Sequence, residues 1–272
     1  MSRTIFMVSD GTGITAETLG NSLMTQFDHV QTKNITIPYV NSPAKAYDAV
    51  DKINEVSQSS LERPIAFVTI VKPDLLTIIN EANAFIVDLF STFLSPLEKE
   101  LGESSSYSVG KSHAVKNSQA YRNRIEALDY ALQHDDGLRI KGYEKADIIL
   151  IGVSRSGKTP SSLYMALHFG AFAANYPFTD EDLERTTLPE CLKPFKNKLF
   201  GLTIDCDRLQ QIRSERKPNS NYASVSTCRK ETAQIESIYQ HENIPYINST
   251  ACSIEEISTK VLSTIGFQRR FK

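Results

Sequence analysis

Short apolar runs separated by longer mixed stretches dominate the first hundred residues of the chain. The near-continuous apolar runs that predict strands lie at 4–9, 35–40, 65–71 and 84–90. Runs of this kind, without polar alternation, are typical of strands buried on both faces of a parallel sheet. The stretches between them have helical character: Thr15 can cap a helix over 16–27, and Ser42 with Pro43 marks the start of another. Strands that alternate with helices predict βαβ units.

The second half resumes this pattern after an interruption. Residues 103–118 contain six serines and no apolar period, which predicts a long loop or linker. A helix is predicted over 121–133, with its apolar stripe at Ile125, Leu128, Ala131 and Leu132. Three further strands are predicted at 148–152, 199–204 and 245–248.

These elements predict an α/β fold class with mainly parallel sheets and flanking helices. We expect an N-terminal α/β domain over residues 1–145 and a C-terminal nucleotide-binding domain over residues 146–272, and one continuous sheet is the alternative. The chain has 272 residues, which is enough for one large domain or two smaller ones.

Charge and cysteine usage exclude several classes of protein. The 30 basic and 32 acidic side chains give a formal net charge of −2, so no general attraction to nucleic acid or to an anionic membrane is expected. No apolar run approaches the roughly 20 residues that cross a bilayer. The scattered cysteines and the lack of a signal peptide favour a cytoplasmic protein with reduced thiols. The five histidines form no zinc-binding pair.

The most informative segment joins the strand at 148–152 to the next helix. It matches the phosphate-binding pattern G-x-x-x-x-G-K-[ST], known as the P-loop. The residues predicted to bind the nucleotide phosphates are Gly152, Val153, Ser154, Arg155, Ser156, Gly157, Lys158 and Thr159. The glycines free the backbone to turn its N–H groups toward phosphate oxygens, and the helix start adds a positive dipole end. The alternative is a strand-to-helix turn that happens to use two glycines.

Lys158 and Thr159 are the candidates for chemistry within this loop. The lysine is placed to reach the terminal phosphate, and the threonine hydroxyl suits a Mg²⁺ ion. A second Mg²⁺ ligand is predicted at Asp205, a carboxylate at the carboxyl end of the strand at 199–204. Asp205 could equally serve as the N-cap of the following helix, and the two roles are compatible.

Three other polar segments have a chemical and a structural interpretation. Ser9 to Glu17 joins a strand end to a helix start, where Asp10 could act as a base or metal ligand, or could belong to a structural turn. Asp135 and Asp136, followed by glycine, suit acid–base chemistry or a C-terminal turn. The basic side chains between 208 and 217 could bind a phosphate or form a solvated helix face.

Five ordered motifs together indicate a family. They occupy residues 9–17, 124–137, 152–160, 201–205 and 212–224. In these motifs the chain resembles the bacterial dikinase regulatory proteins, which include regulators of phosphoenolpyruvate synthase and of pyruvate, phosphate dikinase. The resemblance runs from about Thr4 to Arg270, although the family often carries serine where this chain has Gly157.

The resemblance implies two opposed activities on a dikinase. One is a serine/threonine kinase that uses ADP to phosphorylate a target threonine and inactivates the dikinase. The other is a phosphorylase that removes this phosphate by attack of inorganic phosphate and releases pyrophosphate. The implied partners are phosphoenolpyruvate synthase, ADP, phosphate and Mg²⁺.

Several points stay open at this stage. The base for a threonine acceptor could be Asp10, Asp135, Asp136 or Asp205. The target could instead be pyruvate, phosphate dikinase, and the chain could be a non-catalytic nucleotide-binding switch with 103–118 as its sensing loop, or a small-metabolite kinase. Kinase and phosphorylase could share one site, which we favour, or use two. A homodimer is compatible with the sequence.

Overall fold

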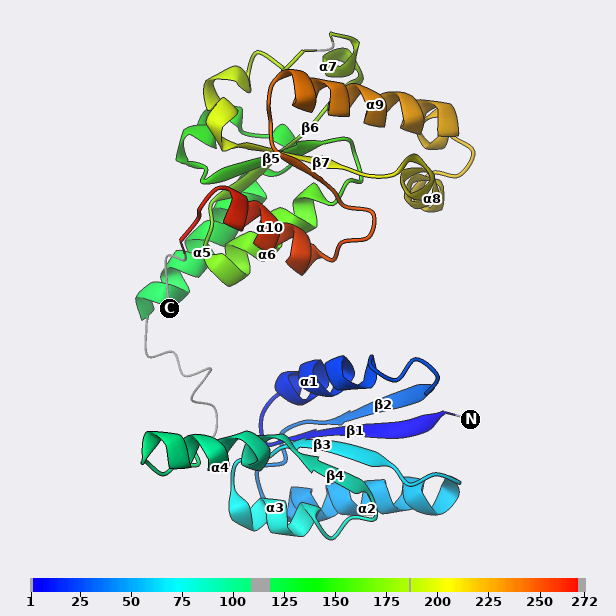
Figure 1. Cartoon of the computed structure of the whole chain (residues 1–272), viewed down its shortest axis with the longest axis vertical. Coiled ribbons are helices and arrows are strands. Elements are labelled where there is room, and N and C mark those ends of the chain that lie inside the picture. The colour runs from blue at the N-terminus through cyan, green and yellow to red at the C-terminus, as the bar shows by residue number, and fades with distance from the viewer. Residues whose placement is uncertain (1, 109–117, 186, 269–272) are drawn as a thin grey trace. The chain divides into compact units, whose positions relative to one another are not determined.

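The chain forms two compact units, residues 1–114 and residues 115–272. The structure is a computed structural model that describes residues 2–108, 118–185 and 187–268 (Figure 1). Each unit is an open parallel sheet of four strands with helices on both faces. The predicted α/β class with parallel sheets is therefore confirmed. Helix α5 (Ser118–Gln133) and the segment up to residue 145 pack within the second unit.

The first unit has the strand order β2-β1-β3-β4. Its strands are β1 (Arg3–Ser9), β2 (Thr32–Ile37), β3 (Ile65–Thr69) and β4 (Phe85–Asp88). Its helices are α1 (Ile14–Met24), α2 (Pro43–Ser59), α3 (Pro73–Ile79) and α4 (Leu89–Leu101). Residues of β1 alternate between two cores: Phe6 and Val8 pack with α2 and α3, whereas Ile5 and Met7 pack with α1.

The starts of the first two helices can be compared with the sequence predictions. Ser42 caps α2 and accepts a hydrogen bond from the Lys45 N–H, with Pro43 in the first turn, as predicted. Helix α1 begins earlier than predicted, because Gly13 rather than Thr15 is its N-cap. A glycine supplies the left-handed backbone at this position, with a φ of 88°.

The second unit has the strand order β6-β5-β7-β8. Its strands are β5 (Ile148–Gly152), β6 (Ala173–Pro177), β7 (Leu199–Thr203) and β8 (Tyr246–Asn248). Its other α-helices are α6 (Lys158–Phe169), α7 (Asp180–Glu184), α8 (Cys206–Arg216), α9 (Val225–His241) and α10 (Ile254–Thr264). Strand β6 is not predicted by the apolar pattern, because its residues Ala-Ala-Asn-Tyr-Pro are not a continuous apolar run.

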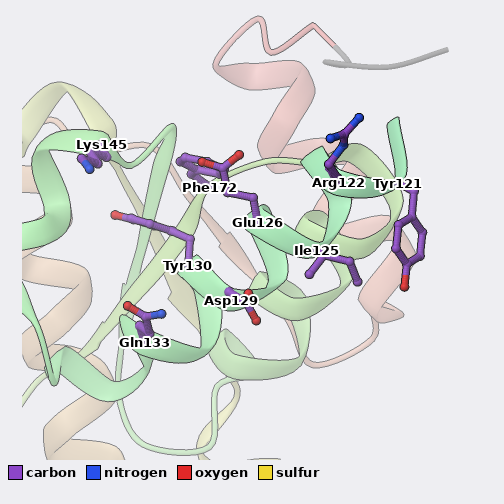
Figure 2. Close-up of a pocket in the computed structure, with 9 residues that line it drawn as sticks. All are labelled: Tyr121, Arg122, Ile125, Glu126, Asp129, Tyr130, Gln133, Lys145 and Phe172. Carbon is purple, nitrogen blue, oxygen red and sulfur yellow. The ribbon is translucent and has the colours of Figure 1, made fainter. Parts of the chain in front are cut away.

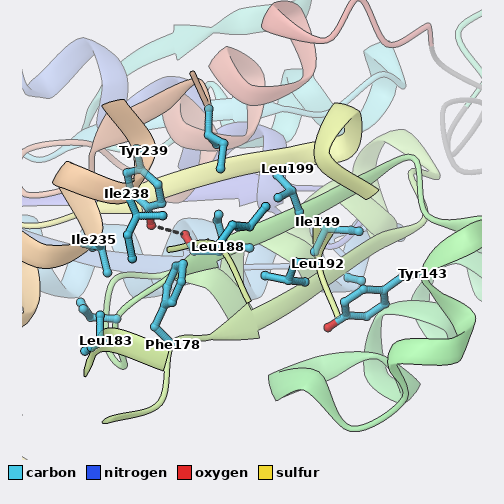
Figure 3. Packing of buried hydrophobic residues seen from close by; sticks show 14 of the residues in the cluster. Tyr143, Ile149, Phe178, Leu183, Leu188, Leu192, Leu199, Ile235, Ile238 and Tyr239 are labelled. Carbon is cyan, nitrogen blue, oxygen red and sulfur yellow. Dashed lines mark hydrogen bonds between the residues drawn. The ribbon is translucent and has the colours of Figure 1, made fainter. Parts of the chain in front are cut away.

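Both faces of the second sheet are buried. Ile149 and Ile151 of β5 pack under α9, where the Tyr239 hydroxyl also donates to the carbonyl of Ile151 at 3.0 Å (Figure 3). Ile148 and Leu150 face the opposite core with α6 and α10. These continuous apolar strands are buried as the sequence pattern predicted.

Helix α5 buries only part of the face that was predicted. Ala127 and Ala131 pack against Ala166 of α6, while Ile125 and Leu132 of the predicted stripe are exposed. Small side chains allow α5 and α6 to approach closely, so alanines form the contact between these two helices, while Tyr130 is the large side chain of α5 that is buried in the neighbouring core. The predicted loop over 103–118 is irregular up to residue 108, and its residues 109–117 lie outside the described part of the chain.

Candidate functional site

The loop between β5 and α6 lies at the switch point of the second sheet. In the order β6-β5-β7-β8 the chain crosses to opposite sides of β5, and ligands of such sheets bind outside the carboxyl ends of the central strands. A Cβ on Gly152 would lie 2.5 Å from the Leu202 carbonyl oxygen, so glycine is needed where β5 and β7 meet. Gly157 forms the N-cap of α6 with a φ of 92°. The loop thus delivers its backbone to the start of a helix.

Lys158 is held inside this loop. Its side chain is 4% exposed, and its Nζ donates to the carbonyl oxygen of Val153 at 2.9 Å. Burial lowers the pKa of Lys158 to about 8, although Asp136 and Asp135 act in the opposite direction. An anion that reached the ammonium would favour its charged form.

A carboxylate lies directly beside the start of α6. The Thr159 hydroxyl donates to Asp135 Oδ1 at 2.8 Å, and the side-chain amide of Asn175 donates to the same oxygen at 2.5 Å. The backbone N–H of Asp136 in turn donates to Asn175 Oδ1 at 3.0 Å. Asp136 has a positive φ of 48° and is exposed. The two aspartates therefore form a turn, as one of the two interpretations predicted. This turn contacts the start of α6 beside the loop between β5 and α6.

A buried arginine supports the loop from the other side. Arg213 of α8 is fully buried and donates to the carbonyl oxygens of Ser154 and Tyr222, each at 3.1 Å. Its charge is paired with Glu231 at 2.6 Å, and its guanidinium stacks on the Tyr222 ring. The Tyr222 hydroxyl shares a hydrogen bond of 2.9 Å with Ser154 Oγ.

The other basic residues between 208 and 217 differ from Arg213. Arg208, Arg216 and Lys217 are exposed, as the solvated-face interpretation expected. The segment thus combines both kinds of residue, with one arginine that binds the loop backbone and three cations in solvent.

The loop residues fit a phosphate group. Ser156 Oγ is buried and has no hydrogen-bond partner within the described residues. Arg155 is exposed at the loop tip with a φ of 78°, a conformation that residues other than glycine rarely adopt. An orphaned hydroxyl, a buried ammonium and an exposed guanidinium around one helix start are donors that suit phosphate oxygens.

Asp205 follows β7, which neighbours β5 in the sheet. It occupies the N-cap position of α8, but its side chain makes no capping hydrogen bond. Its Oδ1 accepts from the side-chain amide of Asn248 at 2.6 Å, and its carboxylate is exposed. Its position therefore leaves it open to solvent at the switch point, and its role as a Mg²⁺ ligand stays a prediction.

Asp10 belongs to the first unit, in the loop between β1 and α1. Its side chain is 7% exposed, and Oδ2 accepts from the Val71 N–H at 2.8 Å. Burial raises the pKa of Asp10 above its ordinary value. This carboxylate joins the ends of β1 and β3, which is a structural function, and its catalytic role stays a prediction.

A separate groove runs along α5. It encloses about 620 Å³, and Figure 2 shows that most of its lining side chains come from this helix. Its lining residues are Tyr121, Arg122, Ile125, Glu126, Asp129, Tyr130, Gln133, Lys145 and Phe172. None of the site residues predicted from the sequence lines this groove.

Within the residues that the structure describes, no group of three or more His, Cys, Asp or Glu side chains could hold a metal ion by itself. This finding is compatible with Mg²⁺, which typically takes one or two carboxylates and completes its shell with water and substrate phosphates. In the same described residues, no helix is long and apolar enough to cross a membrane.

Two site residues have no signal in the sequence. Asn175 lies on the strand that the pattern missed, and Tyr222 lies in a motif that was noted for its arginines. A lone asparagine or tyrosine carries no chemical signature, so only the fold places them beside Asp135 and Ser154.

Comparison with known proteins gives one consistent result. The model of a family described as kinase/pyrophosphorylase matches residues 5–262. A protein of Legionella pneumophila (strain Corby) is 60% identical over 270 residues, which cover 99% of this chain and 100% of that protein. A protein of Pseudomonas aeruginosa is 56% identical over 272 residues, with 100% and 99% coverage. Both carry the provisional name phosphoenolpyruvate synthase regulatory protein.

Proposed function

The chain belongs to the kinase/pyrophosphorylase family, and from this premise we propose that it regulates phosphoenolpyruvate synthase by reversible phosphorylation. In one direction it transfers a phosphoryl group from ADP to a threonine of the synthase and inactivates it. In the other direction it transfers that group to inorganic phosphate and reactivates the synthase. The observation that carries this proposal is the loop from Gly152 to Thr159, with Lys158 buried in it and Asp135 bonded to Thr159.

Phosphoryl transfer needs little more than positioning and charge neutralisation. In the kinase direction the threonine oxygen attacks the β-phosphorus of ADP, the bond to the α-phosphate oxygen breaks, and AMP leaves. Lys158 and the loop N–H groups would neutralise the charge on the transferring group. Asp136 would take the hydroxyl proton, because its exposed carboxylate faces solvent while Asp135 already accepts two hydrogen bonds.

The phosphorylase direction uses the same groups in a different order. An oxygen of inorganic phosphate attacks the phosphorus of phosphothreonine, the bond to the threonine oxygen breaks, and pyrophosphate forms. The threonine oxygen recovers a proton, which Asp136 would return. Inorganic phosphate and the β-phosphate of ADP have similar charge and geometry, so one loop can accept either.

A Mg²⁺ ion fits beside this loop. The Thr159 hydroxyl with Asp135, or with the exposed Asp205, offers oxygen ligands of the type that Mg²⁺ prefers. When bound, the ion would supply charge neutralisation to the phosphates. Asp205 is the ligand favoured by the sequence, and Asp135 is the one already in contact with Thr159.

The test combines the purified protein with phosphoenolpyruvate synthase, ADP and Mg²⁺, and measures AMP formation together with phosphothreonine on the synthase. Phosphate is then added, and pyrophosphate release and recovered synthase activity are measured. Pyruvate, phosphate dikinase in place of the synthase is the parallel arm. Phosphorylation of pyruvate, phosphate dikinase but not of the synthase would move the proposal to that target. If neither protein leads to AMP formation, the proposal is refuted.

A further inference from the structure

Asn175 connects the two aspartates of the site to the interior of the second sheet. It lies in the middle of β6 and is fully buried. Its side-chain amide is used at both ends, since Nδ2 donates to Asp135 Oδ1 at 2.5 Å and Oδ1 accepts from the Asp136 N–H at 3.0 Å. Each aspartate is therefore bonded to the same buried side chain.

The backbone of Asn175 is also fixed. Its N–H donates to the carbonyl oxygen of His134 at 3.1 Å, and its carbonyl oxygen accepts from the Tyr143 hydroxyl at 2.9 Å. Tyr143 is itself fully buried in the core of this unit (Figure 3). The asparagine thus fixes the turn that follows α5 to the sheet and to the core.

This support matters because the turn is strained. Asp136 has a φ of 48°, in the left-handed region that is unfavourable for residues other than glycine. Such conformations persist where surrounding contacts hold them. The hydrogen bond from the Asp136 N–H to Asn175 Oδ1 is a contact of this kind.

We infer that Asn175 is a positioning residue for phosphoryl transfer. It holds Asp135 beside Thr159 and orients Asp136 toward the acceptor. This inference rests on the proposed function and adds to it a residue outside the loop and outside the aspartate motif. Asparagine suits this position because one end of its amide donates to a carboxylate and the other accepts from a backbone N–H. Neither aspartate nor an apolar residue offers both.

The test compares Asn175→Ala, which removes both bonds, with Asn175→Asp, which keeps an acceptor for the Asp136 N–H but removes the donor. The matched controls are the same substitutions at Asn54 of the first unit, whose side chain accepts from the Asn83 N–H. A hydrogen bond to a charged group supports an expected fall in kcat of about 10- to 100-fold for Asn175→Ala. The KM for ADP should change less than threefold, because the loop itself is intact. The kcat of Asn175→Asp should fall at least as far as that of Asn175→Ala, because the new carboxylate lies beside the carboxylate of Asp135.

The second readout needs neither substrate nor activity. Hydrogen exchange at the Asp136 amide, measured by NMR, should be slow in the wild type and at least tenfold faster in Asn175→Ala. Wild-type kcat in a folded Asn175→Ala protein would overturn the inference, as would an unprotected Asp136 amide in the wild type, which can be measured even if the variants fail to fold. If the wild type transfers no phosphate to either dikinase, the proposed function fails, and the exchange measurement still decides whether Asn175 holds the turn.

Discussion

The two units share a strand order but differ in what their first loops carry. In both, the second strand in the order is followed by a loop that ends in a left-handed glycine at a helix N-cap, Gly13 in the first unit and Gly157 in the second. After Gly13 comes Ile14, which is exposed, whereas after Gly157 comes Lys158, which is buried. The acid of the first loop binds a backbone N–H, whereas the second loop contains no acid and the aspartates near its lysine come from the turn after α5. A loop that ends in a left-handed glycine therefore has a structural role in both units, and any catalytic role depends on the side chains that surround it.

The largest expected effect is that of Lys158→Ala. Loss of the ammonium removes charge neutralisation from the transferring phosphate, so ADP-dependent phosphorylation should fall by about 100- to 1000-fold or more. If the reactions share the loop, pyrophosphate release from phosphorylated synthase should fall equally. The control is Ile14→Ala, at the corresponding place in the first unit.

Initial rates in both directions decide this prediction, with circular dichroism to verify folding. A wild-type rate of pyrophosphate release in Lys158→Ala would show that the phosphorylase uses a separate site. Equal losses in Lys158→Ala and Ile14→Ala would remove the distinction between the two loops.

The fold was predictable from the sequence to the extent that apolar runs record burial. Among the described strands, β1, β3, β5 and β7 are buried runs of this kind. Strand β2 begins with three exposed polar residues and starts three residues before the predicted run. Strand β6 is not an apolar run, since its Asn175 faces polar partners and its Pro177 ends it. The buried face of α5 was predicted correctly only at Ala131, for a related reason. Periodicity identifies large apolar residues, but Ala127 and Ala131 pack against α6 because they are small.

The candidate site was predictable only in part. The spacing of Gly152, Gly157 and Lys158 predicted a tight loop between a strand and a helix, and the structure has this loop between β5 and α6. Its binding of phosphate stays a prediction. The contact between Thr159 and Asp135 joins residues 24 positions apart, and the support of Ser154 by Arg213 joins residues 59 positions apart. Contacts of this kind depend on how helices pack on the sheet, which spacing along the chain does not determine.

The next prediction concerns the two carboxylates that could serve Mg²⁺. If Asp205 is a ligand, Asp205→Asn should raise the Mg²⁺ concentration for half-maximal rate by about tenfold. A tenfold weaker affinity for Mg²⁺ corresponds to a loss of roughly 1.4 kcal/mol of binding free energy. Asp135→Asn tests the carboxylate that Thr159 contacts. Mg²⁺ titrations of the kinase rate compare the two variants. A shift only in Asp135→Asn would assign the metal to the Thr159 pair and leave Asp205 a structural role.

The two N-cap glycines allow a direct comparison of stability with function. Alanine at either position must adopt a left-handed conformation, which costs about 1–2 kcal/mol. At Gly13 its Cβ would also lie 2.9 Å from Thr36 Cγ2, while at Gly157 it meets no atom within 4 Å. Gly13→Ala should therefore lower the free energy of unfolding more than Gly157→Ala, as chemical denaturation will measure. Only Gly157→Ala should raise the KM for ADP, and the reverse pattern would contradict our assignment of the loops.

The smallest effect is expected for Asp10→Asn. Asparagine can still accept from the Val71 N–H, and it removes a buried carboxylate whose pKa is raised by burial. A raised pKa means that the folded state binds this proton more tightly than the unfolded state does, so the ionised form destabilises the fold at neutral pH. The variant should match or exceed the wild type in free energy of unfolding at pH 7, by about 1 kcal/mol or less.

The pH dependence and the activity of this variant give independent checks. As the pH falls through the raised pKa of Asp10, the wild type becomes protonated and its deficit relative to Asp10→Asn should shrink. Denaturation curves at several pH values measure this difference. The kinase rate should stay within about twofold of the wild type, because the buried carboxylate of Asp10 holds the Val71 N–H and asparagine can hold it too. A loss of about 100-fold or more, the range of a missing general base, would make Asp10 the base and would give the first loop a chemical role equal to that of the second.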